Sequence, residues 1–249
     1  MSSNNQALTG ARDVGILGKQ VGRVMTKALR PDVKQLLNAL MREVLLGNTH
    51  LSIANGLRDA DPVVLDTAGV FFGLTFTAHL EAAQMYAAKL FDTHRDAETI
   101  HTLLRTAEQN TRLFTNGSPH EVHAAVRDAK RRVSGLDRII KPLRARRNKV
   151  LAHLAPETVI DPVKLIRDAK LTLDDLLEVF NAAGEIVNGI SRLYMDATHL
   201  TAFPSHDDYK HALKLVAEAK CAEIRKYEDE YKTRWTGARA KNCPPIEQV

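Results

Sequence analysis

An arginine, an asparagine and a histidine stand close together on one predicted helical segment, as Arg147, Asn148 and His153. Histidine is the only side chain whose unperturbed pKa lets it take up and return a proton near neutral pH. A guanidinium is always charged and can hold phosphate oxygens with a rigid fork of donors. These residue types could cleave RNA without a metal, because the base would accept the 2′-hydroxyl proton while the guanidinium stabilises the charged phosphate.

The apolar spacing around this segment singles out one of its arginines. Apolar side chains recur at steps of three and four residues, and Arg147 occupies a place where the pattern calls for an apolar one. A guanidinium in such a seam is costly unless it is paired or holds an anion, so we interpret Arg147 as a site residue. The seam consists of Leu136, Ile140, Leu143, Arg147, Val150 and Leu154.

The spacing between Arg147 and His153 raises a geometric problem. Six residues correspond to roughly 120° around a helix, so the two side chains would not point the same way. Arg147 could reach round, or the helix could loosen before Pro156. A second copy of the chain could also complete the site across a two-fold axis.

Positive charge is concentrated in the same region. Residues 127–149 contain ten Lys or Arg and two Asp, a local charge of 10 − 2 = +8, against +5 for the whole chain. Basic clustering on a helix is typical of proteins that contact phosphate backbones. The alternative is a solvated basic face that acidic neighbours balance in space. The residues predicted to bind RNA are Arg138, Lys141, Arg144, Arg146 and Lys149.

The elements that must position these residues are all predicted to be helices. Apolar residues recur with helical spacing almost throughout, and strand-like alternation is scarce. Ser118-Pro119 with Glu121, and Thr172 with Asp174-Asp175, have the pattern of helix starts, the two aspartates serving the helix dipole rather than catalysis. A kink is expected at Gly135 and Pro142. The predicted helices cover residues 14–29, 31–46, 62–91, 97–114, 172–194 and 207–235, and a basic helix begins at Pro119 and carries the segment from Arg144 to His153.

The fold class that follows is an all-α, up-and-down bundle of four to five core helices with additional N- and C-terminal helices. Three parts are predicted along the chain. Residues 1–30 form a flexible start and an N-terminal helix, residues 31–200 form the bundle, and residues 201–249 form a charged helix and tail.

Several classes of function lack support in the sequence. No apolar run is long enough for a membrane span and no signal segment appears, so a cytoplasmic protein with no membrane partner is expected. Cys221 and Cys243 lack CxxC spacing, and reduced thiols are expected. His120 and His123 have no third ligand with clear spacing, so neither a metal nor a cofactor is predicted. His79 is interpreted as a core or interface histidine.

The segment from Arg147 to His153 resembles the signature of HEPN domains, in which an arginine and a polar residue precede a histidine. The chain is more specifically similar to HEPN-like proteins of the abortive-infection U group. The similar features extend over roughly residues 31–200. They are Phe71-Phe72, Leu90-Phe91-Asp92, the RNKxxAH block, and the Leu-Thr-x-Asp-Asp-Leu start at Leu171 to Leu176.

This resemblance implies a helical bundle that forms a homodimer, with two Arg-His motifs facing one cleft. It implies that Arg147 and His153 are the catalytic pair of a metal-independent endoribonuclease, with Asn148 orienting the histidine. The implied substrate is RNA, cut to a 2′,3′-cyclic phosphate in a toxin-antitoxin or phage-defence setting, with a possible antitoxin partner. The alternative is a non-catalytic HEPN-like dimer that binds nucleotide, RNA or a nucleotidyltransferase partner.

Overall fold

The computed structural model describes residues 32–94, 96–148, 170–203 and 207–232. Within these ranges the chain forms eight α-helices and one short 3-10 turn, and no strand. The prediction of an all-α fold is confirmed. The helix predicted at residues 14–29 lies outside the described residues, as does His153.

Helix α2 (Val33–Asp59) is longer than the sequence indicated. We expected a helix over residues 31–46 that stopped before Gly47, and this boundary is wrong. Gly47 is buried within α2, and a Cβ atom at this position would overlap the ring of Phe180. The glycine therefore permits a close approach of another helix and does not end its own.

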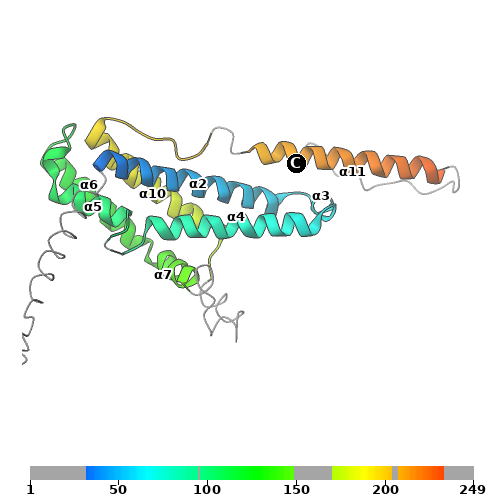
Figure 1. The fold of residues 1–249 in the computed structure, drawn as a ribbon, viewed down its shortest axis with the longest axis horizontal. Helices are drawn as coiled ribbons and strands as arrows, with labels where there is room; N and C mark the ends of the chain where they lie inside the picture. Colours follow the sequence, from blue (N-terminus) through cyan, green and yellow to red (C-terminus); the bar gives the residue numbers. More distant parts are fainter. Residues whose placement is uncertain (1–31, 95, 149–169, 204–206, 233–249) are drawn as a thin grey trace, which may run out of the picture.

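The helix predicted over residues 62–91 is divided in two. Helix α3 (Pro62–Asp66) is a single short segment, and α4 (Gly69–Leu90) follows after a turn. The backbone of Ala68 leaves the helical region, with φ −144° and ψ 56°. As Figure 1 shows, α4 then returns beside α2, so that the two form a long hairpin.

The next four elements are short and lead to the candidate site. Helix α5 (Ile100–Gln109) and the turn η1 (Thr111–Leu113) replace the single helix predicted over residues 97–114. Helix α6 (Pro119–Gly135) begins at the predicted cap, where the Ser118 side chain and Glu121 bind each other's backbone N–H groups.

Helix α7 (Asp137–Arg146) follows α6 after a break at Leu136, rather than the kink that the sequence suggested. Leu136 leaves the helical region in ψ, with φ −85° and ψ 0°, and its N–H group contacts three carbonyls of the last turn of α6. Pro142 lies inside α7 without ending it. At Arg147 and Asn148 the helix widens into a π-type turn, a feature that occurs often at functional sites.

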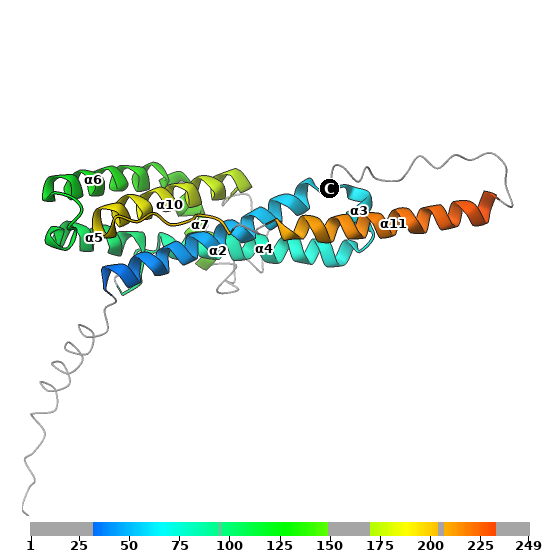
Figure 2. The same ribbon diagram turned by 90° about the horizontal axis from the view of Figure 1, so that it is seen from above.

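Two long helices complete the described chain. Helix α10 (Leu173–Met195) starts at the predicted cap, because Thr172 and Asp175 form a reciprocal capping box. Helix α11 (Asp208–Lys232) agrees closely with its predicted range. In both views α11 extends away from the bundle, past the end of the α2–α4 hairpin (Figures 1 and 2).

The main core lies among α2, α4, α5, α6, α7 and α10. A second, smaller core joins α11 to the far end of the hairpin, where Leu213 and Ala217 of α11 pack on Leu57, Ala60 and Val64. The largest fully buried side chains of the main core are Phe91, Phe114, Phe180, Leu37, Leu40 and Leu143.

Only the second half of α4 is central to the bundle. Ala83, Ala87 and Leu90 are buried, as expected of a central helix. In the first half Val70 is 80% exposed and Leu74 is 66% exposed. The prediction of a helix apolar on most sides is correct. In its first half Phe72 and Phe76 pack against the second core, whereas Val70, Phe71 and Leu74 stay largely exposed.

Three further sequence expectations concern the environment of the chain. None of the helices described here is long and apolar enough to cross a membrane. No group of three or more potential metal ligands occurs among the described residues. Cys221 is disulfide-bonded in the structure, so the expectation of a reduced thiol at this position is wrong.

Candidate active site

Arg147 contacts two side chains at the C-terminal end of α7. Its Nη1 atom donates to Oδ2 of Asp92 at 2.5 Å, and its Nε atom donates to Oδ1 of Asn148 at 2.9 Å. The side chains of Arg147 and Asp92 are 21% and 25% exposed. The guanidinium that interrupts the apolar seam is therefore paired, which removes most of the cost of placing it there.

Asp92 is held in place by the end of α4. Its backbone N–H group donates to the Lys89 carbonyl, and its Oδ1 atom accepts from the N–H group of His94 at 3.0 Å. Burial opposes ionisation of this carboxyl, but the hydrogen bonds from Arg147 and from the backbone outweigh it. The pKa of Asp92 is therefore lowered from its ordinary value, and the carboxylate is charged at neutral pH.

A second arginine fastens α7 to the same turn. The Nη2 atom of Arg144 donates to the backbone carbonyl of Phe91, while its Nε atom is buried without a hydrogen-bond partner. Two adjacent residues of one turn thus accept hydrogen bonds from α7: Phe91 from Arg144, and Asp92 from Arg147. Since both arginines reach the same turn, α7 is held to the end of α4 at two points.

His101 of α5 lies beside this turn. Burial of its ring and the charges of Arg144 and Arg105 lower the pKa of His101, while the Phe91 backbone acts in the opposite direction. The net result is a lowered pKa, so the imidazole is neutral at neutral pH. Its Nε2 atom is buried and has no hydrogen-bond partner.

The other residues predicted to bind RNA differ in their surroundings. Arg138 is paired with Asp175 at 2.9 Å and also with Glu178, and Lys141 is paired with Asp137 at 3.0 Å. Burial lowers the pKa of the half-buried Arg146, and the charge of Glu81 acts in the opposite direction. Lys149 lies outside the described residues.

Acidic residues neutralise much of the basic stretch before Arg144. The alternative that we considered, a basic face balanced in space, therefore describes α6 and the first half of α7. Among the described residues near the site, Arg144 and Arg146 have no carboxylate within ion-pair distance, and the same holds for Arg105 of α5, whose side chain donates to Thr102. The ion pairs of α6 are Lys130 with Glu108, Arg131 with Asp128, and Arg132 with Glu185.

The comparison with protein families identifies the family of the chain that carries this site. A family model for HEPN proteins of the AbiU2 type matches residues 30–215. The chain belongs to the AbiU2 family of HEPN proteins. No curated protein and no solved structure matches it. The matched range contains every helix from α2 to α10, and therefore both arginines, Asp92 and His101.

The structure places two of the three predicted catalytic residues of this AbiU2 protein, Arg147 and Asn148, and does not describe the third, His153. Arg147 and Asn148 are adjacent, but the Asn148 side chain contacts Arg147, whereas we expected it to orient His153. The position of His153 relative to either residue lies outside the described part of the chain, so its role stays a prediction.

Two residues of this site were missed in the sequence. Asp92 was noted only as part of a Leu-Phe-Asp motif, without a partner, and His101 was not singled out. The positions of Asp92 and Arg147 differ by 55 residues, and no helical periodicity connects residues so far apart. The signal for Asp92 was its place directly after a predicted helix. His101 carried no signal, because its importance depends on which helices pack together.

Proposed function

We propose that this AbiU2 HEPN protein is a metal-independent endoribonuclease in a phage-defence or toxin-antitoxin setting, with Arg147 and His153 as its catalytic residues. The observation that supports this proposal most directly is the state of Arg147. It is partly exposed, held in a fixed orientation by Asp92 and Asn148, and located where α7 widens. A preorganised guanidinium of this kind is suited to a phosphate whose charge grows during reaction.

Arg147 retains donors for a substrate although it is already paired. A guanidinium carries five N–H donors, and the contacts with Asp92 and Asn148 use two, which leaves 5 − 2 = 3. Those three donors could hold nonbridging phosphate oxygens without breaking either contact. Asp92 would then act as a positioning residue, because it fixes the direction of the guanidinium and does not contact RNA.

The proposed reaction uses the 2′-hydroxyl of the RNA as the nucleophile. His153 accepts the 2′-hydroxyl proton, the 2′-oxygen bonds to the adjacent phosphorus, and the bond from phosphorus to the 5′-oxygen breaks. The leaving 5′-oxygen takes a proton, which gives a 2′,3′-cyclic phosphate and a 5′-hydroxyl. DNA would not be cut, because it lacks the 2′-hydroxyl.

A homodimer is part of the proposal, because Arg147 and His153 diverge around an ideal helix. A second copy could bring its histidine to the arginine of the first. The exposed first half of α4 is compatible with self-association, since Val70, Phe71 and Leu74 form an apolar surface and no Asp, Glu, Lys or Arg lies between residues 67 and 80. An antitoxin or a nucleotidyltransferase stays a possible further partner.

The test is cleavage of a single-stranded RNA in the presence of EDTA, with the products analysed by mass spectrometry. We expect the wild-type protein to give 2′,3′-cyclic phosphate ends, and Arg147→Ala and His153→Ala each to abolish them while the helical circular dichroism is unchanged. Arg131→Ala is the matched control, because Arg131 is an exposed arginine of α6 paired with a carboxylate. Cleavage that EDTA abolishes, or variants as active as wild type, would rule out the mechanism.

A non-catalytic role gives a different result in the same experiment. In that case the wild-type protein binds RNA or nucleotide, measured by fluorescence anisotropy, but leaves the RNA intact. This outcome would support the alternative of a HEPN-like binding or scaffold protein. Sedimentation velocity on the same samples reports whether the chain is a homodimer.

A further inference from the structure

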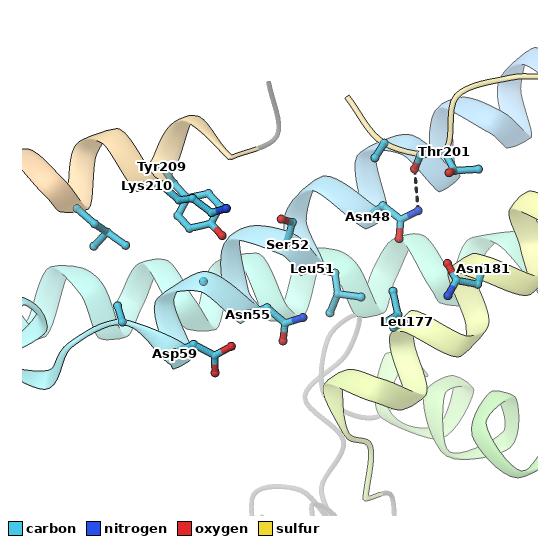
Figure 3. A pocket seen from close by; sticks show the side chains of 14 residues that line it. Asn48, Leu51, Ser52, Asn55, Asp59, Leu177, Asn181, Thr201, Tyr209 and Lys210 are labelled. Carbon is cyan, nitrogen blue, oxygen red and sulfur yellow. Dashed lines mark hydrogen bonds between the residues drawn. The ribbon is translucent and has the colours of Figure 1, made fainter. Parts of the chain in front are cut away.

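The irregular segment of residues 197–203, which we call the strap, lies on α10 and α2 and is held there by asparagine side chains. Asn188 of α10 exchanges two hydrogen bonds with the backbone of His199, donating to its carbonyl at 3.2 Å and accepting from its N–H group at 2.7 Å. Asn48 of α2 donates to the Thr201 carbonyl at 2.7 Å (Figure 3). Asparagine amides thus bind an irregular backbone at two successive places.

Each of these asparagines has a second one seven residues away on its own helix. Asn55 follows Asn48 on α2, and Asn181 precedes Asn188 on α10. Seven residues are about two turns, so the members of each pair share a face and lie about 10 Å apart. Gly47 is close to Phe180 while Gly184 is close to Val44, so the two helices run in opposite directions. Asn55 and Asn181 therefore both lie beyond the strap.

The second pair of asparagines has no backbone to bind. The Oδ1 atom of Asn55 is buried without a hydrogen-bond partner. The side chain of Asn181, which lies within α10, makes no hydrogen bond with any residue that the structure describes. A buried amide oxygen without a partner is unfavourable, so a ligand that donates a hydrogen bond to it would be stabilised there.

A cavity of about 520 Å³ lies at this point, between α2, α10, the end of the strap and the start of α11. Figure 3 shows Asn55 and Asn181 at its margin, with Leu51 and Leu177 between them. Tyr209 of α11 closes another side. Its ring lies so close to Gly56 that a Cβ atom there would overlap it.

The charged groups around the cavity are already paired. Asp59 accepts from Arg58 at 2.7 Å, and Lys210 is paired with Asp207 at 3.3 Å. The described lining therefore offers no unpaired cation to a phosphate, and no unpaired anion to a basic ligand. What it offers are amide and hydroxyl groups, from Asn55, Asn181 and Ser52 among others, and aliphatic walls. This chemistry matches an uncharged polypeptide backbone with small side chains.

We propose that this cavity, which we call the asparagine cleft, binds an extended backbone segment of a partner protein, continuing the mode in which the strap is bound. Asn55 and Asn181 would each pair with a peptide unit, as Asn48 and Asn188 do. The leucines would accept small apolar side chains between those peptide units. This binding site is separate from the Arg147 site and does not depend on RNA cleavage.

The test is a titration of the full-length protein with N-acetyl-trialanine amide, followed by the side-chain amide signals of asparagine in ¹⁵N NMR spectra. We expect the signals of Asn55 and Asn181 to shift, and that of the exposed Asn38 on α2 to stay in place. Adenosine, added at the same concentrations, should shift neither. If adenosine shifts both the Asn55 and the Asn181 signals and the peptide shifts neither, the cleft binds a small heterocycle and not a peptide backbone, and the proposal is overturned.

Two substitutions make the assignment specific. Asn181→Leu on the exposed face of α10 and Asn55→Leu should each weaken peptide binding about threefold to tenfold, the effect of losing one hydrogen bond. Asn38→Leu is the matched control and should leave binding unchanged. Asn181 is exposed, so its variant should fold even if the Asn55 variant does not. Binding that survives Asn181→Leu unchanged, or no shift of either signal with the peptide, would overturn the proposal.

Discussion

Asp92 and Arg147 form an ion pair of 2.5 Å that joins the turn after α4 to the end of α7. The pair fixes a guanidinium where the apolar seam of α7 would place a hydrophobic residue. Breaking it would leave a partly buried charge without its partner and would also release the guanidinium from its orientation. The substitution Asp92→Asn separates these two effects.

Asp92→Asn should reduce RNA cleavage more than it reduces stability. Asparagine retains an acceptor for Arg147 but loses the charge, so the guanidinium is held less firmly. Misplacement of a catalytic group by about 1 Å can cost about 100-fold in rate, and we expect a loss of about 10- to 100-fold in kcat/KM. Asp128→Asn removes the equivalent charge from an exposed pair with Arg131 and should have little effect. Equal activities of the two variants would show that Asp92 does not position Arg147.

His101 should set part of the acid limb of the pH dependence of cleavage. Its pKa is lowered by burial and by Arg144 and Arg105, while Asp92 acts in the opposite direction. As the pH falls through that lowered pKa, a new positive charge forms beside Arg144 and disturbs the turn at Phe91 that both groups contact. His101→Asn cannot titrate, so its activity should extend to lower pH than that of the wild-type protein. If the low-pH decrease in activity is the same in His101→Asn and in the wild-type protein, another group causes it.

The histidine pair between α2 and α4 should make stability depend on pH. The Nδ1 atoms of His50 and His79 lie 2.8 Å apart, so one ring donates and the other accepts. Burial lowers both pKa values from 6.5, and the charge of His79 lowers that of His50 further. The unfolded chain therefore binds protons first as the pH falls below about 6.5, and the folded state loses stability from there down to the folded pKa.

Removing one member of this pair should weaken that dependence. One group contributes at most about 1.4 kcal/mol per pH unit. His79→Gln should flatten the slope of unfolding free energy between pH 6.5 and 5, measured by urea denaturation, and change little above pH 7. His120→Gln, an exposed histidine at the start of α6, serves as the control. If His79→Gln and the wild-type protein have the same slope, the pair does not resist protonation.

How much the sequence could predict depended on whether the signal was local. The caps at Ser118 and Thr172 were predicted correctly, because a capping box involves residues three positions apart. Gly47 was misread as a helix end, since its close neighbour Phe180 is distant in sequence. The candidate site shows the same contrast. The break in the apolar seam is a local signal and predicts Arg147, whereas its partner Asp92 is identified only from the packing of α7 on the end of α4.

The ion pairs of the basic helices predict a weak salt dependence of RNA binding. If all the predicted basic residues contacted phosphates, the binding constant would fall steeply with salt. Because Arg138 and Lys141 are paired, the main described cations at the site are Arg144 and Arg146, which have no ion pair, and Arg147, which keeps three donors beside its pair with Asp92. With about 0.7 counterions released per phosphate of single-stranded RNA, three contacts give a slope of log K against log salt of about −2. A slope of about −3.5, which five contacts would give, would show that the paired Arg138 and Lys141 also bind RNA.

Two glycines provide the test of packing between α2 and α10. Gly47→Ala would place a methyl group against the ring of Phe180 in the main core, and overpacking of this kind costs about 1–3 kcal/mol. Gly73→Ala on α4 meets no atom within 4 Å and should instead stabilise the helix by about 0.5–1 kcal/mol. Thermal unfolding followed by circular dichroism should therefore shift in opposite directions for the two variants. A Gly47→Ala protein as stable as wild type would mean that α2 and α10 do not approach as closely as the core requires.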